Sequence, residues 1–499
     1  MIDLTVAEAA TVLGAEVVGG GDLAARLTDL VIDSRSVSPG SLFVALRGER
    51  VDGHDYLDAA WRSGAAAAVS DRPPASPDGR GPLLQVADPL AALGTLARHL
   101  VDRAARRGLR VVGITGSQGK TSTKDLLGQV LERQAPTVAP RGNLNNEIGV
   151  PLTVSRIGPD TRYLVSEMGA RGVGHIAYLC RLTPPDVGIV LNIGHAHLGE
   201  FGSKALIARA KGELVEALPA SGVAVLNADD RLVWDMRGRT RASVLGFSVV
   251  DRPASERAVW ARDITSEPDG RCRFLLHVQT PDTNPGALPV SLQLPGRHQV
   301  VNALAAAAGA IALGIDPAEI AAGLSAAGPR SRWRMETRLR DDQLLVINDA
   351  YNANPDSMRA ALETAAEIGR ARRRQDPNAR TWAVLGDMLE LGETAAAEHT
   401  AIGSYVAALG FDRLIAVGDF AHQIASGARA AGLTAVAVHA LRAKTQAATA
   451  VRADAGPMDT VLVKASRGLA LETVAEDILR PAQPTTPTRQ QTADSEDRS

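Results

Sequence analysis

A glycine-rich segment, GITGSQGKTST at residues 113 to 123, contains the residue types that bind phosphate. An apolar run precedes it and a helical pattern of leucines and valines follows it, so we expect a turn from strand to helix. Glycines let successive backbone amides turn toward one point, and a helix N-terminus adds partial positive charge there. The segment therefore predicts a loop that cradles the terminal phosphates of a nucleotide.

Two residues of this loop carry the predicted chemistry. Lys120 is expected to contact the β- and γ-phosphates, and the hydroxyl of Thr121 to ligate a magnesium ion. The spacing departs from G-x-x-x-x-G-K-[ST], because the first glycine is Gly113 and position 114 is Ile114. The alternative is a glycine-rich turn with a solvated lysine, but strand, turn and helix together favour phosphate binding.

Further polar side chains follow the other apolar runs of the same region. Ligands bind beyond the carboxyl ends of parallel strands, so these side chains are candidates for one site. Glu167 is a natural magnesium ligand, whereas the His-x-His pair ending at His197 is also compatible with zinc or with histidines bonded to the backbone. The candidates at strand ends are Lys120, Glu167, His195, His197, Asn227 and Asp229.

Lys211 lies in IARAKGELVEAL, a segment with a helical pattern. A lysine inside a helix most often lies on a solvated face, with its aliphatic stem on the protein and its ammonium group in water. Spacing alone therefore assigns Lys211 no chemical role.

The elements that must position these residues divide the chain into three α/β blocks. Residues 1–108 contain short β-branched runs and an alanine-rich helix near 88 to 105. Residues 109–330 alternate apolar strands with helices, which predicts a mainly parallel sheet covered on both faces. Residues 331–480 predict a doubly wound, Rossmann-like domain, but no G-x-G-x-x-G follows its strands, so a dinucleotide is not supported. Residues 481–499 are predicted to be disordered.

Composition excludes several classes of function. The 499 residues are 45% apolar and 22% charged, with a formal net charge of -2, so neither nucleic-acid binding nor stable membrane insertion is expected. No apolar run reaches the length of a membrane span, and the N-terminus has no basic signal. Two widely spaced cysteines, Cys180 and Cys272, suit a reducing compartment. We expect a cytoplasmic monomer that acts on small molecules.

Several longer motifs resemble one family. They are DSRSVSPGSLFVALRGERVDGHDY, GNLNNEIGVPLT, NIGHAHLGEFGS, AKGEL, DAYNANPDSM, LGDMLELG and KASRG, between residues 33 and 468. Together they resemble the ATP-dependent Mur ligases, relatives of folylpolyglutamate synthase, whose TGS/T-x-GKT loop accounts for the shifted glycine. The resemblance implies an N-terminal domain for a UDP-sugar, a central ATPase domain and a C-terminal domain that closes over both. It also implies ATP and Mg²⁺, with UDP-N-acetylmuramoyl-tripeptide and D-alanyl-D-alanine as substrates joined through an acyl phosphate.

The resemblance assigns roles to individual positions. Catalytic roles fall on Lys120, His197 and Lys211, the last as a carbamate that binds magnesium together with Thr121, Glu167 and His197. Nucleotide contacts fall on Thr115, Gly116, Ser117, Gln118, Gly119, Lys120, Thr121, Ser122, Asn302, Arg334, Asp349 and Asn352. Contacts to the other substrates fall on Ser34, Arg35, Arg47, His54, Asn145, Asn146, Tyr351 and Asn354.

One position departs from the family, which commonly has two aspartates before the tyrosine motif where this chain has Asn348 and Asp349. The role of position 348 is therefore in doubt. Three alternatives stay open: a Mur-type ligase that adds a single amino acid, a P-loop kinase or NTPase switch, and a non-catalytic nucleotide-binding scaffold. Amide formation separates the ligases from the kinase or switch, and a screen of single amino acids separates the two ligases.

Overall fold

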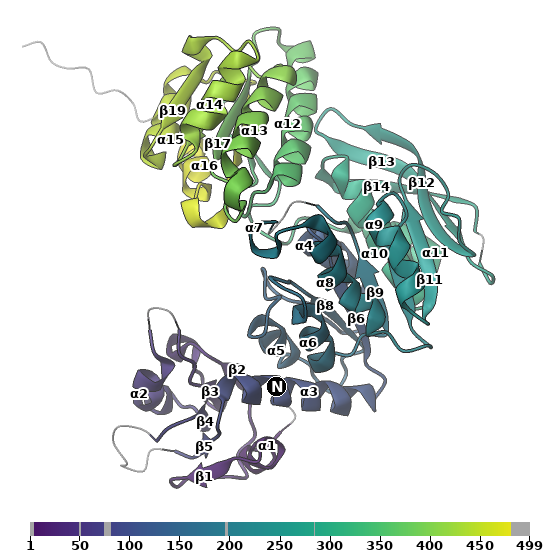
Figure 1. Cartoon of the computed structure of the whole chain (residues 1–499), viewed down its shortest axis with the longest axis vertical. Helices are drawn as coiled ribbons and strands as arrows, with labels where there is room; N and C mark the ends of the chain where they lie inside the picture. The colour runs from purple at the N-terminus through teal and green to yellow at the C-terminus, as the bar shows by residue number, and fades with distance from the viewer. Residues whose placement is uncertain (1–3, 49–50, 74–80, 195–197, 284, 481–499) are drawn as a thin grey trace, which may run out of the picture.

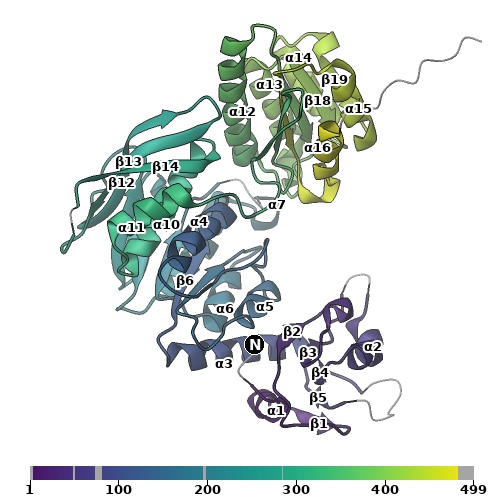
Figure 2. The ribbon, with the colours of Figure 1, turned by 180° about the vertical axis from the view of Figure 1, so that it is seen from behind.

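Three β-sheets, one in each successive part of the chain, organise the molecule. The computed structural model describes residues 4–48, 51–73, 81–194, 198–283 and 285–480. Figures 1 and 2 show three bodies in a row, with the N-terminal body at one end and the C-terminal body at the other. The predicted α/β class with three domains is confirmed. The boundaries at 108 and 330 stay predictions, and the tail 481–499 lies outside the described residues.

The N-terminal sheet has the strand order β1-β5-β4-β3-β2, with β1 antiparallel to β5 and the other pairs parallel. Its strands are β1 (Glu16–Val18), β2 (Asp29–Val31), β3 (Ser41–Val44), β4 (Ala67–Ser70) and β5 (Leu83–Gln85). Its helices are α1 (Val6–Leu13), α2 (Leu57–Arg62) and α3 (Pro89–Ala105).

Helix α3 joins the first two domains. Asp88 caps its first amides and Pro89 occupies its first turn, a strong start signal that explains why sequence located this helix. The helix packs against α1 on one side and against two helices of the central domain on the other. The start of α3 thereby comes close to the central domain.

The central sheet has nine strands in the order β14-β13-β12-β11-β10-β9-β6-β8-β7. The strands are β6 (Arg110–Thr115), β7 (Thr137–Val138), β8 (Tyr163–Glu167), β9 (Val187–Val190), β10 (Val223–Asn227), β11 (Ser243–Ser248), β12 (Arg257–Ser266), β13 (Arg271–Gln279) and β14 (Ala287–Pro295). The helices are α4 (Lys120–Glu132), α5 (Gly149–Val154), α6 (His175–Leu182), α7 (Leu198–Phe201), α8 (Lys204–Glu216), α9 (Arg231–Trp234), α10 (His298–Ala312) and α11 (Pro317–Ala326).

Strands β7 to β12 are parallel, as predicted, while β13 and β14 add an antiparallel extension that sequence did not predict. Burial alternates along β13, which is typical of an antiparallel strand with one face in water. Strand β6 lies between β8 and β9, so the chain runs from β6 to β7 and β8 on one side and then crosses β6 to reach β9 on the other side. This switch point is where a parallel sheet opens a crevice for ligands.

The C-terminal sheet has the order β15-β16-β20-β17-β18-β19, and all its pairs except β15 with β16 are parallel. The strands are β15 (Glu336–Leu339), β16 (Leu345–Asn348), β17 (Thr381–Gly386), β18 (Arg413–Val417), β19 (Val438–Leu441) and β20 (Thr460–Lys464). The helices are α12 (Pro355–Gln375), α13 (Ala395–Ala408), α14 (Ala421–Ala430), α15 (Lys444–Asp454) and α16 (Glu472–Leu479). Within the described ranges, no helix is both long and apolar enough to cross a membrane.

Candidate active site

The predicted phosphate loop connects the end of β6 to the start of α4. Gly119 has a positive φ of 80°, and a Cβ there would overlap with the Oδ1 atom of Asn302. A Cβ on Gly116 would lie 2.8 Å from the Cβ atom of Leu191. Both positions therefore require glycine. The first amides of α4 have no acceptor inside their own helix, so they are available to an anion.

Asn192, after β9, holds the outer part of this loop. Its Oδ1 atom accepts from the Gln118 amide at 3.0 Å, and its Nδ2 group donates to the Gln118 carbonyl at 3.2 Å. The Ser117 hydroxyl accepts from the Gly194 amide at 2.9 Å. Thr115 is fully buried and donates to the Met168 carbonyl at 2.9 Å, so its hydroxyl supports the fold. Sequence analysis did not single out Asn192, although it follows a predicted strand.

Lys120 and Lys211 point at the same carbonyl. The Nζ atom of Lys120 donates to the Gly116 oxygen at 2.8 Å, and that of Lys211 donates to it at 3.1 Å. Burial lowers the pKa of Lys120, while Glu167 raises it and Arg334 lowers it. Burial lowers the pKa of Lys211 well below its usual range, and the positive charge of Lys120 lowers it further. Lys211 is only 2% exposed, which rules out the solvated face that its spacing suggested.

The neighbours of Lys211 in the motif AKGEL have structural roles of their own. Gly212 leaves room for the guanidinium group of Arg239, which a Cβ would displace. Glu213 is buried and accepts from the amides of Gly174 at 2.6 Å and Ala177 at 2.9 Å. The helix thus brings a lysine to the phosphate loop and anchors the start of α6 with the next carboxylate.

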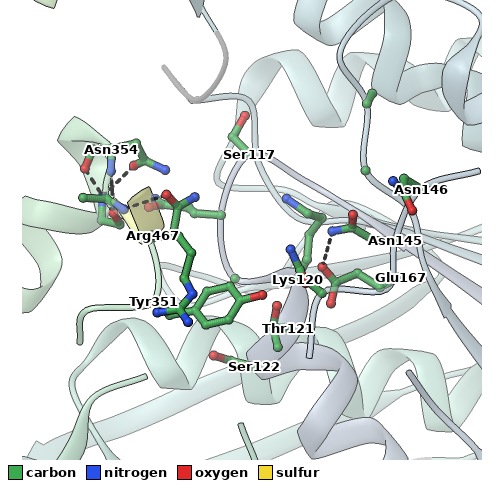
Figure 3. Close-up of a pocket in the computed structure, with 18 of the residues that line it drawn as sticks. Ser117, Lys120, Thr121, Ser122, Asn145, Asn146, Glu167, Tyr351, Asn354 and Arg467 are labelled. Atoms are coloured by element: carbon green, nitrogen blue, oxygen red, sulfur yellow. Dashed lines mark hydrogen bonds between the residues drawn. The ribbon is translucent and has the colours of Figure 1, made fainter. Parts of the chain in front are cut away.

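Glu167, at the end of β8, is 1% exposed. Its Oε1 atom accepts from the Nδ2 group of Asn145 at 2.8 Å (Figure 3), whereas its buried Oε2 atom has no hydrogen-bond partner among the described residues. Leaving a buried carboxylate oxygen unpaired is costly unless a ligand pairs with it. Thr121 is also buried, and its Oγ1 atom accepts from Arg334 at 3.0 Å.

These two oxygens fit a magnesium ion that is shared with phosphate. Magnesium is usually held by one or two protein oxygens, substrate phosphates and water. In the described part of the chain no group of three or more His, Cys, Asp or Glu residues could form a complete protein cage. The other predicted metal ligand, His197, lies outside the described residues, as does His195. Asn227 and Asp229 bond instead to Leu191, Ser248 and Val249 within the fold.

A cavity of about 1110 Å³ connects the phosphate loop with both neighbouring domains. Figure 3 shows Lys120, Thr121 and Glu167 on one side and Tyr351, Asn354 and Arg467 of the C-terminal domain on the other. Other lining residues that sequence did not assign include Asp88, Arg171, His175, His298, Leu389, Lys464 and Ser466. Ser34, Arg35, Arg47 and His54 do not line this cavity. The structure therefore does not bring these predicted substrate residues to the phosphate loop.

The residues predicted to contact the nucleotide are held in place by neighbouring side chains. The Nδ2 group of Asn302 donates to Gln299 at 2.9 Å, and its Oδ1 atom accepts from Thr123 at 3.4 Å. The Arg334 guanidinium lies 4.2 Å from the centre of the Tyr351 ring. Asn302, Arg334 and Tyr351 all line the cavity, so the structure brings them together with the phosphate loop.

Comparison with known proteins assigns this arrangement to a family. The model of the Mur ligase middle domain matches residues 114–310, that of the Mur ligase glutamate ligase domain matches 333–467, and that of the Mur ligase catalytic domain matches 26–100. The chain belongs to the Mur ligase family. A UDP-N-acetylmuramoyl-tripeptide–D-alanyl-D-alanine ligase of Mycobacterium leprae is 42% identical over 509 residues, covering 95% of this chain and 98% of the relative.

Solved structures agree with this assignment of the Mur ligase fold. MurF from Acinetobacter baumannii has a TM-score of 0.82 and 32% identity, covering 96% of this chain and 99% of that chain. MurF from Thermotoga maritima, solved in complex with ADP, has a TM-score of 0.73 and 27% identity, covering 92% and 98%. The resemblance recognised from the motifs is confirmed, and the chain is a ligase.

A buried ion pair fixes the C-terminal wall of this Mur ligase. The Nζ atom of Lys464 lies 2.6 Å from Asp349 Oδ2 and donates to the Asn352 carbonyl at 2.8 Å. Asp349 also accepts from the Met335 amide at 3.0 Å. Its carboxylate is therefore engaged by the protein, and a nucleotide contact at Asp349 stays a prediction. Lys464 could not be predicted as a site residue, because its partner Asp349 lies 115 positions away in the chain.

The neighbouring asparagines also shape this loop. The Oδ1 atom of Asn348 accepts from the Ala350 amide at 3.2 Å, so position 348 supports the turn without an acid. Asn352 Oδ1 accepts from the Ala353 amide at 2.9 Å. Asn354 caps α12 by accepting from the Ser357 amide at 2.9 Å. The Oδ1 atom of Asn354 is thus engaged in the helix cap, and the substrate role of this residue stays a prediction.

We expect Lys464→Met to lower the free energy of unfolding of this Mur ligase by about 3 kcal/mol or more, because a buried carboxylate loses its partner. Denaturant titration followed by tryptophan fluorescence measures this loss. The double variant Lys464→Met with Asp349→Asn should lose less than the sum of the two single variants. Lys444→Met is the control, since within the described ranges Lys444 bonds to two carbonyls, those of Leu469 and Ala470, and to no carboxylate. Additive losses in the double variant would show that the pair is not coupled.

A buried histidine of the same domain, His399, is held in its neutral form. His399 is fully buried and stacks on Phe420, with ring centroids 4.4 Å apart. Its Nε2 atom accepts from the Met388 amide at 2.8 Å, and its Nδ1 atom lies 2.6 Å from the Ala395 carbonyl. The imidazole is therefore neutral with its proton on Nδ1. Burial lowers its pKa below 6.5, against the opposing effects of Ala395, Asp387 and Glu398.

We expect the C-terminal domain to lose stability as pH falls below about 6.5, because unfolded His399 binds a proton that the folded imidazole resists. The contribution is complete above pH 6.5 and is lost as pH falls toward the folded pKa, by at most about 1.4 kcal/mol per pH unit. Unfolding measured from pH 7.5 to 5 in the wild type and in His399→Gln tests this. The two pH profiles should diverge below pH 6.5, and parallel profiles would contradict the assignment.

Proposed function

We propose that this Mur ligase uses ATP to join D-alanyl-D-alanine to UDP-N-acetylmuramoyl-tripeptide in peptidoglycan precursor synthesis. The observation that carries the proposal is the phosphate loop with Lys120 and Glu167, which opens into a cavity shared with the C-terminal domain. A relative that matches 95% of the chain bears the name of this activity, and a structural neighbour binds ADP. The cavity is large enough to hold a nucleotide and a peptide together.

An amide does not form from a carboxylate and an amine at neutral pH without activation. In the proposed reaction the tripeptide carboxylate attacks the γ-phosphate, which gives an acyl phosphate and ADP. The dipeptide amine then attacks the acyl carbon, and phosphate leaves. Catalysis of both steps consists mainly of positioning and charge stabilisation, as in other phosphoryl transfers.

The residues of this chain supply that charge and positioning. Lys120 and the first amides of α4 offset the repulsion between the carboxylate and the phosphate oxygens. Asn145 holds Glu167 so that its second carboxylate oxygen has no partner within the described part of the chain. Magnesium, when bound, would be held by Thr121 and Glu167 and would neutralise phosphate charge. The C-terminal wall around Tyr351 and Arg467 would exclude water from the acyl phosphate.

The other roles that the resemblance implies belong to this proposal. His197 would complete the magnesium site, Lys211 would act as a carbamate, and Ser34, Arg35, Arg47 and His54 would bind the uridine nucleotide. The last four residues would reach the cavity only after domain movement, because they lie outside it in this arrangement. We also propose that the enzyme is a cytoplasmic monomer without stable membrane insertion.

Phosphate release tests the function. The purified chain is incubated with ATP, magnesium, the UDP-linked tripeptide and D-alanyl-D-alanine, and each component is omitted in turn. Release should require all four, with one amide formed per phosphate. Release with single amino acids instead of the dipeptide would favour another Mur-type ligase. Release without amide formation would favour an NTPase switch.

A further inference from the structure

A second cavity, of about 630 Å³, lies on the outer side of α4. We name it the arginine recess. Thr121, Arg334 and Tyr351 line both cavities, so these three residues form the wall between the recess and the phosphate site. The described residues of the recess come from α4, from the segment after β7, from Arg156 and from the linker that joins the central and C-terminal domains. Apart from the roles given to these three shared residues, none of the roles assigned above falls on a residue of the recess.

Its lining is strongly cationic. Lys124, Arg141, Arg156, Arg330, Arg332 and Arg334 face two acids, Asp125 and Glu132. Lys124 pairs with Asp125 at 2.5 Å, and Arg330 donates to Glu132 at 2.6 Å, so both acids are already engaged. The other four cations, Arg141, Arg156, Arg332 and Arg334, therefore find no further carboxylate in the lining of the recess.

Three of these guanidinium groups, those of Arg141, Arg156 and Arg334, have no acid partner among the described residues. Within the described residues, no carboxylate lies within ion-pair distance of Arg141 or Arg156. Arg156 donates to the Ala139 carbonyl at 2.8 Å. Burial lowers the pKa of Arg156, and the charge of Arg141 lowers it further, although Asp29 and Glu132 act in the opposite direction. Both side chains are exposed and line the recess, where their like charges repel each other, so an anion that contacts both is favoured.

The linker adds further donors. Arg332 lies over the Trp333 ring, 5.1 Å from its centre, and reaches Glu476 only at 3.6 Å. Trp333 and Met335 have positive φ angles of 59° and 50°, which side chains with a Cβ rarely adopt. An anion in the recess would join groups of the central domain to this strained linker. Planar guanidinium groups match phosphate oxygens better than they match a single small ion.

We propose that the arginine recess is a second anion site, distinct from the ATP site, that binds a group of two or more linked phosphates. The ligand is a polyphosphate anion, because the recess offers several separated cations and is too large for one phosphate. Arg141 and Arg156 bind it from the central domain, and the linker arginines close over it. Arg141 and Arg156 line the recess but not the cavity of the ATP site, so their substitution separates the two sites.

Pyrophosphate and tripolyphosphate titrated by calorimetry without magnesium test the proposal. Lys120→Ala removes the main lysine contact of the phosphate loop, and the full-length variant should still bind one tripolyphosphate. Adding Arg141→Gln with Arg156→Gln should weaken that binding at least about tenfold, because two charge-assisted contacts are lost. Adding Arg231→Ala with Arg252→Ala, which changes the net charge equally at exposed sites, should leave it within about twofold.

Two outcomes would overturn the proposal. One is Lys120→Ala protein that binds no tripolyphosphate, and the other is an equal loss of affinity in the recess pair and the control pair. Both sets of variants are compared by circular dichroism and thermal melting, so that unfolding is recognised. Arg141→Lys with Arg156→Lys keeps the charge but loses the planar donors, and it should bind more tightly than the glutamine pair.

Discussion

Lys120→Ala should lower the turnover of ATP-dependent ligation by about 10³-fold or more, with the fold intact, because the variant loses the ammonium group that offsets charge in phosphoryl transfer. The loss should fall on kcat more than on the KM of the tripeptide substrate, which binds through other residues. Phosphate release with both peptide substrates present measures it. Turnover within tenfold of the wild type would contradict the phosphate role.

The unchanged stability of this variant is part of the prediction. Lys120 is desolvated, shares the Gly116 carbonyl with Lys211 and stands near Arg334, so its removal relieves the desolvation cost and the repulsion between like charges, and this relief offsets the lost attraction to Glu167. We expect the melting temperature to stay the same or to rise, whereas Lys464→Met should lower it. Lys204→Ala, at an exposed position on α8, is the control for both turnover and melting. A large drop in melting temperature would mean that Lys120 supports the fold.

The phosphate loop could be predicted from sequence because strand, glycine turn and helix are adjacent in the chain. Glu167 was predicted for a related reason, since the carboxyl end of one parallel strand lies beside the next. Asn227 and Asp229 satisfied the same rule and proved to bond within the fold, because β10 lies two strands away from β6. Strand ends identify the correct edge of a sheet but not the place along it.

Residues that act through distant partners could not be placed from sequence. Asn192 and Lys464 belong to motifs that were quoted, yet their partners lie 74 and 115 positions away. Lys211 has the spacing of a surface lysine, and only the packing of α8 against the sheet buries it. The antiparallel extension of the central sheet was missed because short apolar runs do not reveal strand direction. The family resemblance located Lys211, and the structure supplied its surroundings.

The surroundings of Lys211 lead to a second prediction. Its amine is buried beside another lysine, and the Gly116 carbonyl that both share is its one hydrogen-bond acceptor among the residues that the structure describes, so the neutral form is favoured. A neutral amine can add to CO₂ with loss of one proton, which gives a carbamate and turns a cation into an anion. That anion would sit beside the Lys120 ammonium and could hold a cation. The proposed carbamate thus resolves the conflict between two buried like charges.

We expect Lys211→Ala to lower turnover by about 10²- to 10³-fold, because a charge aimed at the transition state is removed. Formate or acetate should partly restore it, since a small carboxylate fills the space that the side chain leaves and supplies the missing negative charge. Lys204→Ala, on the same helix but exposed, should show neither the loss nor the rescue. Carbon-13 NMR of wild-type protein equilibrated with labelled CO₂ should show a carbamate signal that is missing in Lys211→Ala.

The outcomes separate three roles for Lys211. Wild-type turnover in Lys211→Ala would reduce the lysine to a packing residue. Lost turnover without rescue and without a carbamate signal would mean that the amine itself acts, by donating to the Gly116 carbonyl and shaping the loop. Because acid protonates the amine, wild-type activity at low CO₂ should fall more steeply with decreasing pH than activity at high CO₂, which only the carbamate role requires. The neutral amine that the structure favours is thus the form that the proposed carbamate requires.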